Sequence, residues 1–150
     1  MRKWGNDERP IMIGMDFFDR IREEGGYYVD KTAFIDRLLE GKGVYIFTRP
    51  RRFGKTLNLT MMDAYFNVRY KGNTWFDGLR ISELRPDDPM KNSFTVINLS
   101  MKDLKTNSYG DYLWKLGRKI GDIYDLFPEL ERSERISNRQ KTSYRDISMM

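Results

Sequence analysis

Residues 44–66 read Val44-Tyr45-Ile46-Phe47-Thr48-Arg49-Pro50-Arg51-Arg52-Phe53-Gly54-Lys55-Thr56-Leu57-Asn58-Leu59-Thr60-Met61-Met62-Asp63-Ala64-Tyr65-Phe66. The run from Val44 to Phe47 is continuously apolar and has the length of a strand, which is typical of a strand covered on both faces of a parallel sheet. From Leu57 to Phe66 the apolar residues fall along one side of a helix. The stretch therefore predicts a buried strand, a loop and an amphipathic helix, in that order.

The loop between the two predicted elements ends in Gly54-Lys55-Thr56. A phosphate-binding loop needs a glycine because its backbone must come close to the phosphates, and it needs amide groups at a helix N-terminus that donate to anionic oxygens. Lys55 is expected to reach the β- and γ-phosphates, and the Thr56 hydroxyl is expected to ligate Mg²⁺. The sequence thus predicts binding of ATP with Mg²⁺ at this loop.

The loop departs from the usual pattern G-x-x-x-x-G-K-[ST], because Arg49 stands where that pattern has its first glycine. Four cations fall within residues 49–55, the densest positive cluster in the chain. Neutralisation by phosphate explains such a cluster beside an apolar strand better than a solvated loop does. The expected nucleotide-binding residues are Arg51, Arg52, Phe53, Gly54, Lys55, Thr56 and Leu57, with Thr56 also at the metal. For Arg51 and Arg52, contact with phosphate and exposure to solvent both stay open.

Working outward, we expect a short helix over residues 17–24, a brief extended piece at 27–29 and an amphipathic helix over 30–40. Beyond the central stretch, residues 71–92 are expected to form an irregular surface connection. Residues 95–100 are the second strand candidate, lying parallel to the first, and a helix is expected over 111–127 before Pro128. The core is placed at about 13–127, and residues 128–150 form a charged C-terminal segment.

Composition removes several classes of protein. The 150 residues contain no cysteine and no histidine, which excludes disulfides, zinc-thiolate sites and Ser-His triads. The net charge of +5 favours anionic partners. No apolar run approaches the ~20 residues that cross a bilayer, and the N-terminus lacks the apolar stretch of a secretory signal. We therefore expect a cytoplasmic protein that does not associate with membranes.

Several motifs together resemble a known family. Gly25-Gly26-Tyr27-Tyr28-Val29-Asp30-Lys31-Thr32, then Phe34-Ile35, then residues 44–59 are similar to the N-terminal part of the prokaryotic AAA-ATPase-like family. The resemblance is specific between about Ile13 and Phe66 and looser beyond. It implies that the loop with Arg49 is the family's form of the phosphate-binding signature, and that longer members often carry a PD-(D/E)XK nuclease-type domain.

The resemblance implies an α/β fold: a partial P-loop NTPase, AAA-like, with three layers around a parallel sheet. Residues 1–150 would form a single partial domain of this kind. The acidic Walker B strand of such ATPases holds Mg²⁺ and orients the attacking water. The nearest match in this chain, Val96 to Asp103, has its acid three residues late. We expect a chain truncated before the Walker B strand, which binds nucleotide and whose hydrolysis is impaired.

Two other classes of function stay open. Net positive charge and nine tyrosines favour a basic module associated with nucleic acid. Alternatively, the chain is a non-catalytic interaction domain that self-associates or packs against a missing C-terminal half. Tyr27, Tyr28 and Asp30 stand where adenine often lies in related ATPases, but core packing is the commoner role for such residues.

Overall fold

The computed structural model describes residues 9–41, 43–48, 50, 52–127, 132, 134, 137–139, 141, 142 and 146. Contacts between Cα atoms divide the chain into two compact units, Met1–Val96 and Ile97–Met150. Each unit is described by itself. The expectation of one domain over residues 1–150 stays a prediction.

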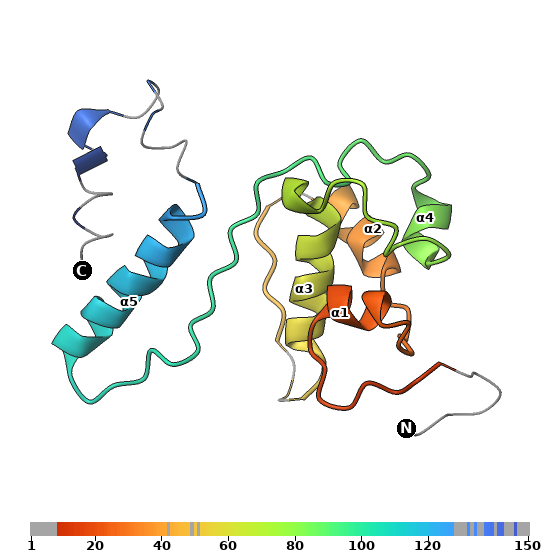
Figure 1. Cartoon of the computed structure of the whole chain (residues 1–150), viewed down its shortest axis with the longest axis horizontal. Helices are drawn as coiled ribbons and strands as arrows, with labels where there is room; N and C mark the ends of the chain where they lie inside the picture. The colour runs from red at the N-terminus through yellow and green to blue at the C-terminus, as the bar shows by residue number, and fades with distance from the viewer. Residues whose placement is uncertain are drawn as a thin grey trace. The chain divides into compact units, whose positions relative to one another are not determined.

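Helices form the regular structure of the described residues (Figure 1). The elements are α1 (Phe18–Glu23), α2 (Ala33–Glu40), α3 (Lys55–Phe66), the 3-10 helix η1 (Val68–Tyr70), α4 (Arg80–Leu84) and α5 (Tyr109–Tyr124). The helices expected near 17–24, 30–40, 57–66 and 111–127 are confirmed, with bounds that shift by a few residues. The short α4 lies inside the segment expected to be irregular.

Local sequence explains where these helices begin and end. α2 follows Thr32 and ends at Gly41, and its apolar residues lie on one stripe with Ile35 fully buried. α5 begins after Ser108, whose hydroxyl accepts a hydrogen bond from the amide of Asp111 at 3.4 Å. That bond satisfies one of the amides that a helix N-terminus leaves without an intrahelical partner.

The core of the first unit lies between α1, α2, α3 and the segment before α4. α1 packs along α3, and Figure 1 shows the two side by side. Phe18 is fully buried, and its ring centroid lies 5.1 Å from that of Tyr28 and 4.9 Å from that of Phe76. Met61 of α3 is also fully buried and accepts a hydrogen bond from the Tyr28 hydroxyl. These contacts fix the direction in which α3 runs, and therefore where its N-terminus lies.

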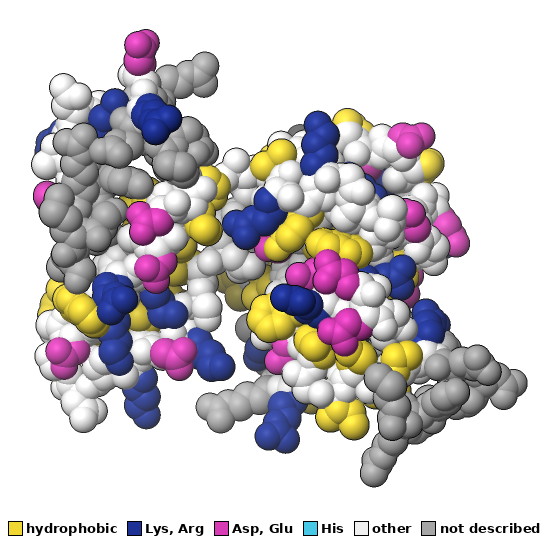
Figure 2. Space-filling model, viewed as in Figure 1, with side chains coloured by type: hydrophobic (Ala, Val, Ile, Leu, Met, Phe, Trp, Pro, Cys, Tyr) yellow, Lys and Arg dark blue, Asp and Glu magenta, His cyan; other side chains and the backbone are white. Residues whose placement is uncertain are grey.

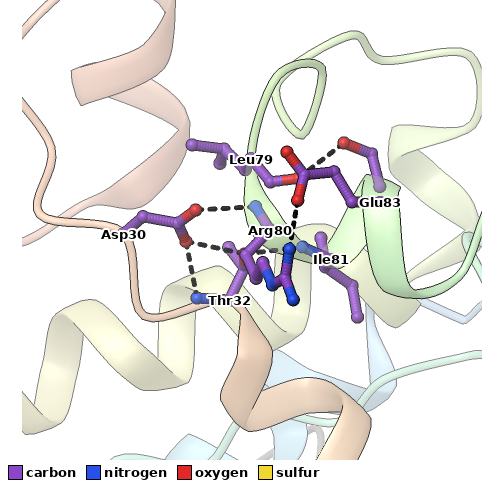
Figure 3. Close-up of polar contacts among 7 residues, drawn as sticks. Asp30, Thr32, Leu79, Arg80, Ile81 and Glu83 are labelled. Atoms are coloured by element: carbon purple, nitrogen blue, oxygen red, sulfur yellow. Dashed lines mark hydrogen bonds and ion pairs between the residues drawn. The ribbon is translucent and has the colours of Figure 1, made fainter.

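Asp30 and Thr32 hold α4 against the start of α2 (Figure 3). The Asp30 carboxylate accepts hydrogen bonds from the Thr32 amide at 2.8 Å, the Thr32 hydroxyl at 2.7 Å and the Arg80 amide at 2.7 Å. The buried Thr32 hydroxyl in turn accepts from the Ile81 amide at 3.1 Å. At the other end of α4, Arg85 donates to Asp36 of α2 at 2.6 Å. We call these bonds the α2–α4 latch.

The predicted parallel sheet is wrong. Within the described ranges the structure contains no strand, only an isolated parallel bridge between Asn67 and Phe94. Residues 44–47 are irregular and exposed, with Val44 at 94% and Ile46 at 84% of their full accessible surface. Residues 95–100 are irregular as well, and Ile97 and Leu99 are exposed. An apolar run forms a buried strand only where neighbouring strands pair with it and helices cover it, and neither segment pairs with a strand among the described residues. The fold is therefore helical and does not have the three-layer α/β arrangement.

The second unit is built on α5. One side of this helix is apolar, and Arg118 stacks on the ring of Trp114, with its guanidinium carbon 5.1 Å from the ring centroid. Leu104 is buried in the turn region that precedes the helix. Leu113 and Trp114 remain exposed.

Candidate site at the N-terminus of α3

Gly54 forms the turn into α3. Its φ is 67° and its ψ is 27°, the left-handed conformation that only glycine adopts without strain. The carbonyl of Gly54 accepts the first intrahelical hydrogen bond from the Asn58 amide at 3.0 Å. A side chain at position 54 would meet no atom within 4 Å, so the backbone conformation and not crowding requires the glycine.

The backbone amides at the start of α3 lack a side-chain cap. Within the part of the chain that the structure describes, no side chain caps this N-terminus, and the first turn contains no acidic residue. Helix N-termini carry a partial positive charge and amides without intrahelical partners. An anion is the chemical species that suits both properties.

Arg52 and Lys55 bring positive charge to the same turn. The Lys55 ammonium lies 3.4 Å from the carbonyl oxygen of Pro50, to which it donates within its own loop. Arg52 has a φ of 66°, which is uncommon for a residue other than glycine. Such backbone strain is concentrated at ligand-binding loops, because the surrounding contacts must hold it in place.

The described members of the predicted site lie together around this turn. Arg52, Phe53, Lys55 and Thr56 are exposed, and Gly54 and Leu57 are half-buried. Leu57 packs against the core of the first unit. The loop residues Arg51 and Arg49 lie outside the described residues. The roles assigned to all of these residues in nucleotide binding stay predictions.

An apolar pocket adjoins the turn, and sequence reasoning missed it. It has a volume of about 160 Å³. Its lining residues come from α2, the segment before the loop and one face of α3: Phe34, Phe47, Lys55, Asn58, Leu59 and Met62. The spacing 55, 58, 59 and 62 is that of a single helix stripe, so the α3 half of this pocket was present as a signal in the sequence.

Tyr28 belongs to the core, which is the commoner role for such a residue. It is buried, and burial raises its pKa to about 12. Because its hydroxyl donates to Met61 inside the core, its ring is not available to stack on a ligand.

Asp30 is part of the α2–α4 latch. Burial raises the pKa of its carboxyl, but the hydrogen bonds from Arg80 and Thr32 outweigh burial and hold the pKa below the ordinary value.

A larger cavity of about 560 Å³ lies at the opposite end of α3, between η1, α4 and the segment after it. Its wall carries charges of both signs, among them Lys71, Arg85, Asp88 and Lys91. The Tyr65 hydroxyl donates to Asp88 at 2.6 Å, and burial with this contact raises the Tyr65 pKa. Three aspartates, Asp77, Asp87 and Asp88, balance the cations of this cavity. The first turn of α3, by contrast, contains no acidic residue.

The described residues contain no cluster of three or more His, Cys, Asp or Glu residues that could hold a metal ion. Magnesium at Thr56 would therefore need phosphate oxygens and water as its other ligands, which is its usual coordination in nucleotide sites. Among the helices of the described residues, none has both the length and the apolar character needed to span a membrane.

Comparison with known proteins places the chain in a family and finds a curated relative. A family model described as Predicted AAA-ATPase matches residues 12–149. An uncharacterized protein in the vnfD 5′ region of Azotobacter chroococcum mcd 1 is 44% identical over 59 residues. That match covers 39% of this chain and 11% of the relative, so the chain corresponds to only a small part of that protein's length. No solved structure matches the chain.

Proposed function

Since the chain belongs to the predicted AAA-ATPase family, we propose that it binds the polyphosphate of ATP at the N-terminus of α3. The family indicates an ATPase-like role that involves nucleotide. The observation that carries the proposal is the turn itself, in which a left-handed Gly54 is followed by an uncapped helix start and by Lys55. The amides donate to phosphate oxygens along the helix dipole, and the ammonium neutralises their charge.

In the proposed complex each residue of the turn has a separate task. Lys55 exchanges the carbonyl of Pro50 for a phosphate oxygen, which gives a charge-assisted contact worth about 1.5–3 kcal/mol. Thr56 ligates Mg²⁺ through its hydroxyl. Arg52 lies in the same turn and adds positive charge, as we propose for Arg51.

Titration calorimetry of the chain with ATP and Mg²⁺ tests this proposal. Lys55→Ala should weaken binding by roughly 10- to 150-fold, which corresponds to the loss of the charge-assisted contact. Lys71→Ala removes the same charge at the far cavity and serves as the matched control. Equal affinities for wild type and Lys55→Ala would place the nucleotide elsewhere. ADP should compete with ATP.

Thr56→Ala separates the metal from the phosphates. This variant should lose the gain in affinity that Mg²⁺ gives and keep the affinity measured in EDTA. If Mg²⁺ strengthens binding equally in both proteins, Thr56 is not a metal ligand.

We propose that hydrolysis by this chain is slow. The best match in sequence to the acid that orients water is Asp103. This exposed turn residue belongs to the second unit and has a φ of 69°. Phosphate release at about 1–100 s⁻¹, the range typical of kinases, that Lys55→Ala abolishes would refute this part of the proposal.

The basic-module alternative makes a different prediction. Binding to nucleic acid depends on phosphate neutralisation, so its affinity falls steeply with salt and needs neither Mg²⁺ nor adenine. A fluorescent single-stranded oligonucleotide that binds wild type and Lys55→Ala equally, and that ADP does not displace, would favour this alternative.

Self-association is a second proposed property, and exposed apolar side chains favour it. Val44, Ile46 and Phe47 of the first unit are among them, and Figure 2 shows apolar side chains exposed on the visible face of the protein. Apolar patches of this kind commonly mark interaction surfaces. Light scattering after size exclusion should give a mass that rises with concentration, and Ile46→Lys should lower it. A constant monomer mass would contradict this.

A further inference from the structure

The apolar pocket beside Lys55 offers what a nucleobase requires, and this inference rests on the proposed binding of polyphosphate at the same helix end. Its volume is about 160 Å³. A cavity of about 150 Å³ with an apolar lining accepts a benzene ring in another protein, so one aromatic ring fits a space of this size. The pocket is open to solvent, which leaves room for the second ring of a purine at its mouth.

Aromatic and aliphatic side chains form the walls of the pocket. Phe34 of α2 and Phe47 meet edge to face, with ring centroids 4.9 Å apart. Leu59 and Met62 of α3 also line the pocket. Planar heterocycles bind favourably between such groups, because stacking on aromatic rings and burial of apolar surface both contribute.

Asn58 is the uncharged polar residue in this lining, which also contains Lys55. Asn58 is half-buried, and its side-chain carboxamide makes no hydrogen bond within the residues that the structure describes. A carboxamide presents one acceptor and two donors, the set that pairs with the N6 and N7 edge of adenine. A half-buried amide without a protein partner gains from such a ligand.

The distances along α3 suit a nucleotide. At a rise of about 1.5 Å per residue, Asn58 lies about 4.5 Å and Met62 about 10.5 Å from Lys55 along the helix axis. A ligand with its phosphates at the helix start therefore places its base one to two turns along the Asn58–Met62 stripe, with the ribose between them.

We infer that the pocket of Phe34, Phe47, Leu59 and Met62 holds the adenine base of the bound nucleotide, and that Asn58 reads its edge. The nucleotide then lies along α3 and not against Tyr28, whose hydroxyl and ring are used in the core. The site distinguishes ATP from inorganic polyphosphate by the base alone.

Titrations of the full chain with ATP and with inorganic tripolyphosphate test the inference. Wild type should bind ATP at least about tenfold more tightly, because stacking and the amide contacts are added to the same phosphate contacts. Asn58→Leu and Leu59→Trp, which fills the pocket, should each reduce that ratio by about tenfold. Asn107→Leu makes the same chemical change as Asn58→Leu at an exposed position of the second unit and should leave the ratio unchanged.

The outcomes separate the two proposals. Equal binding of ATP and tripolyphosphate to wild type overturns the base pocket and leaves the phosphate site standing. A preference for ATP that survives both pocket variants overturns it as well. No binding of either ligand refutes the phosphate site, and the base pocket falls with it. The wild-type comparison can overturn the inference without any variant, and circular dichroism of the helices identifies a variant that fails to fold.

Discussion

The fully buried core and the exposed segment 44–47 are both apolar in sequence, yet the structure treats them in opposite ways. Phe18 is completely buried between Tyr28 and Phe76, whereas Val44 is almost completely exposed. Phe18 lies on α1, which packs against α3, and the irregular segments that contain Tyr28 and Phe76 complete the enclosure. Segment 44–47 touches α2 on one side, through Phe47 and Phe34, and its residues stay exposed. Hydrophobicity therefore determines which residues gain from burial, but only packed neighbours determine which residues achieve it.

The largest effect in this comparison is expected at Phe18. Phe18→Ala should lower the free energy of unfolding by about 3–5 kcal/mol, because it leaves a cavity beside Tyr28 and Phe76. The neighbouring exposed residue provides the control, and Phe17→Ala should change stability by well under half as much. Urea unfolding followed by circular dichroism measures both. Similar losses for the two variants would contradict the described core.

The α2–α4 latch should give the next largest effect. Thr32→Val keeps the shape of the fully buried side chain but leaves the Ile81 amide without its acceptor, which should cost about 1–3 kcal/mol. Thr32→Ser retains the hydroxyl and should lose less. If valine is as stable as threonine in urea unfolding, α4 is not held by this bond.

Acid should weaken the same latch through Asp30. In the folded state the pKa of this carboxyl lies below its ordinary value of 3.8. Its contribution to stability is therefore present above about pH 4 and is lost as the pH falls through the folded-state pKa. The stability advantage of wild type over Asp30→Asn should therefore decrease as the pH falls below about 4. A constant difference between the two proteins from pH 7 to pH 2 would contradict this role.

The smallest effect is expected at the exposed segment. Val44→Ser should change the free energy of unfolding by less than about 0.5 kcal/mol, because the valine is already in contact with solvent. A loss above about 2 kcal/mol would mean that residues 44–47 are buried in solution, and the contrast with Phe18 would disappear.

The sequence predicted the helices well for a physical reason. Apolar periodicity and end signals are local properties, and Gly41 ends α2 as its position indicated. The five-residue α4 was missed because it is too short to show a period and depends on Asp30 and Thr32, 50 and 49 residues away from their partners on α4. The prediction of a sheet was wrong because the pairing of residues 44–47 with 95–100 depends on distant contacts that no local pattern encodes.

In the candidate site, too, the local features could be predicted from the sequence and the distant contacts could not. The turn of Gly54, Lys55 and Thr56 was found because its residues are consecutive and each has a chemical reason to be there. Phe34 and Phe47 of the adjoining pocket were read as a helix face and a strand, because only the folded chain brings them together. Asn58 carried a usable signal, since it stands one helical turn after Lys55.

Amide chemical shifts measured during a titration with ATP and Mg²⁺ test the central claim most directly. If the polyphosphate binds at the start of α3, the largest changes should fall on the amides of Gly54, Lys55 and Thr56, and Lys55→Ala should diminish them. Changes centred on Lys71 and Lys91 at the far cavity, or none at millimolar ATP, would contradict the account.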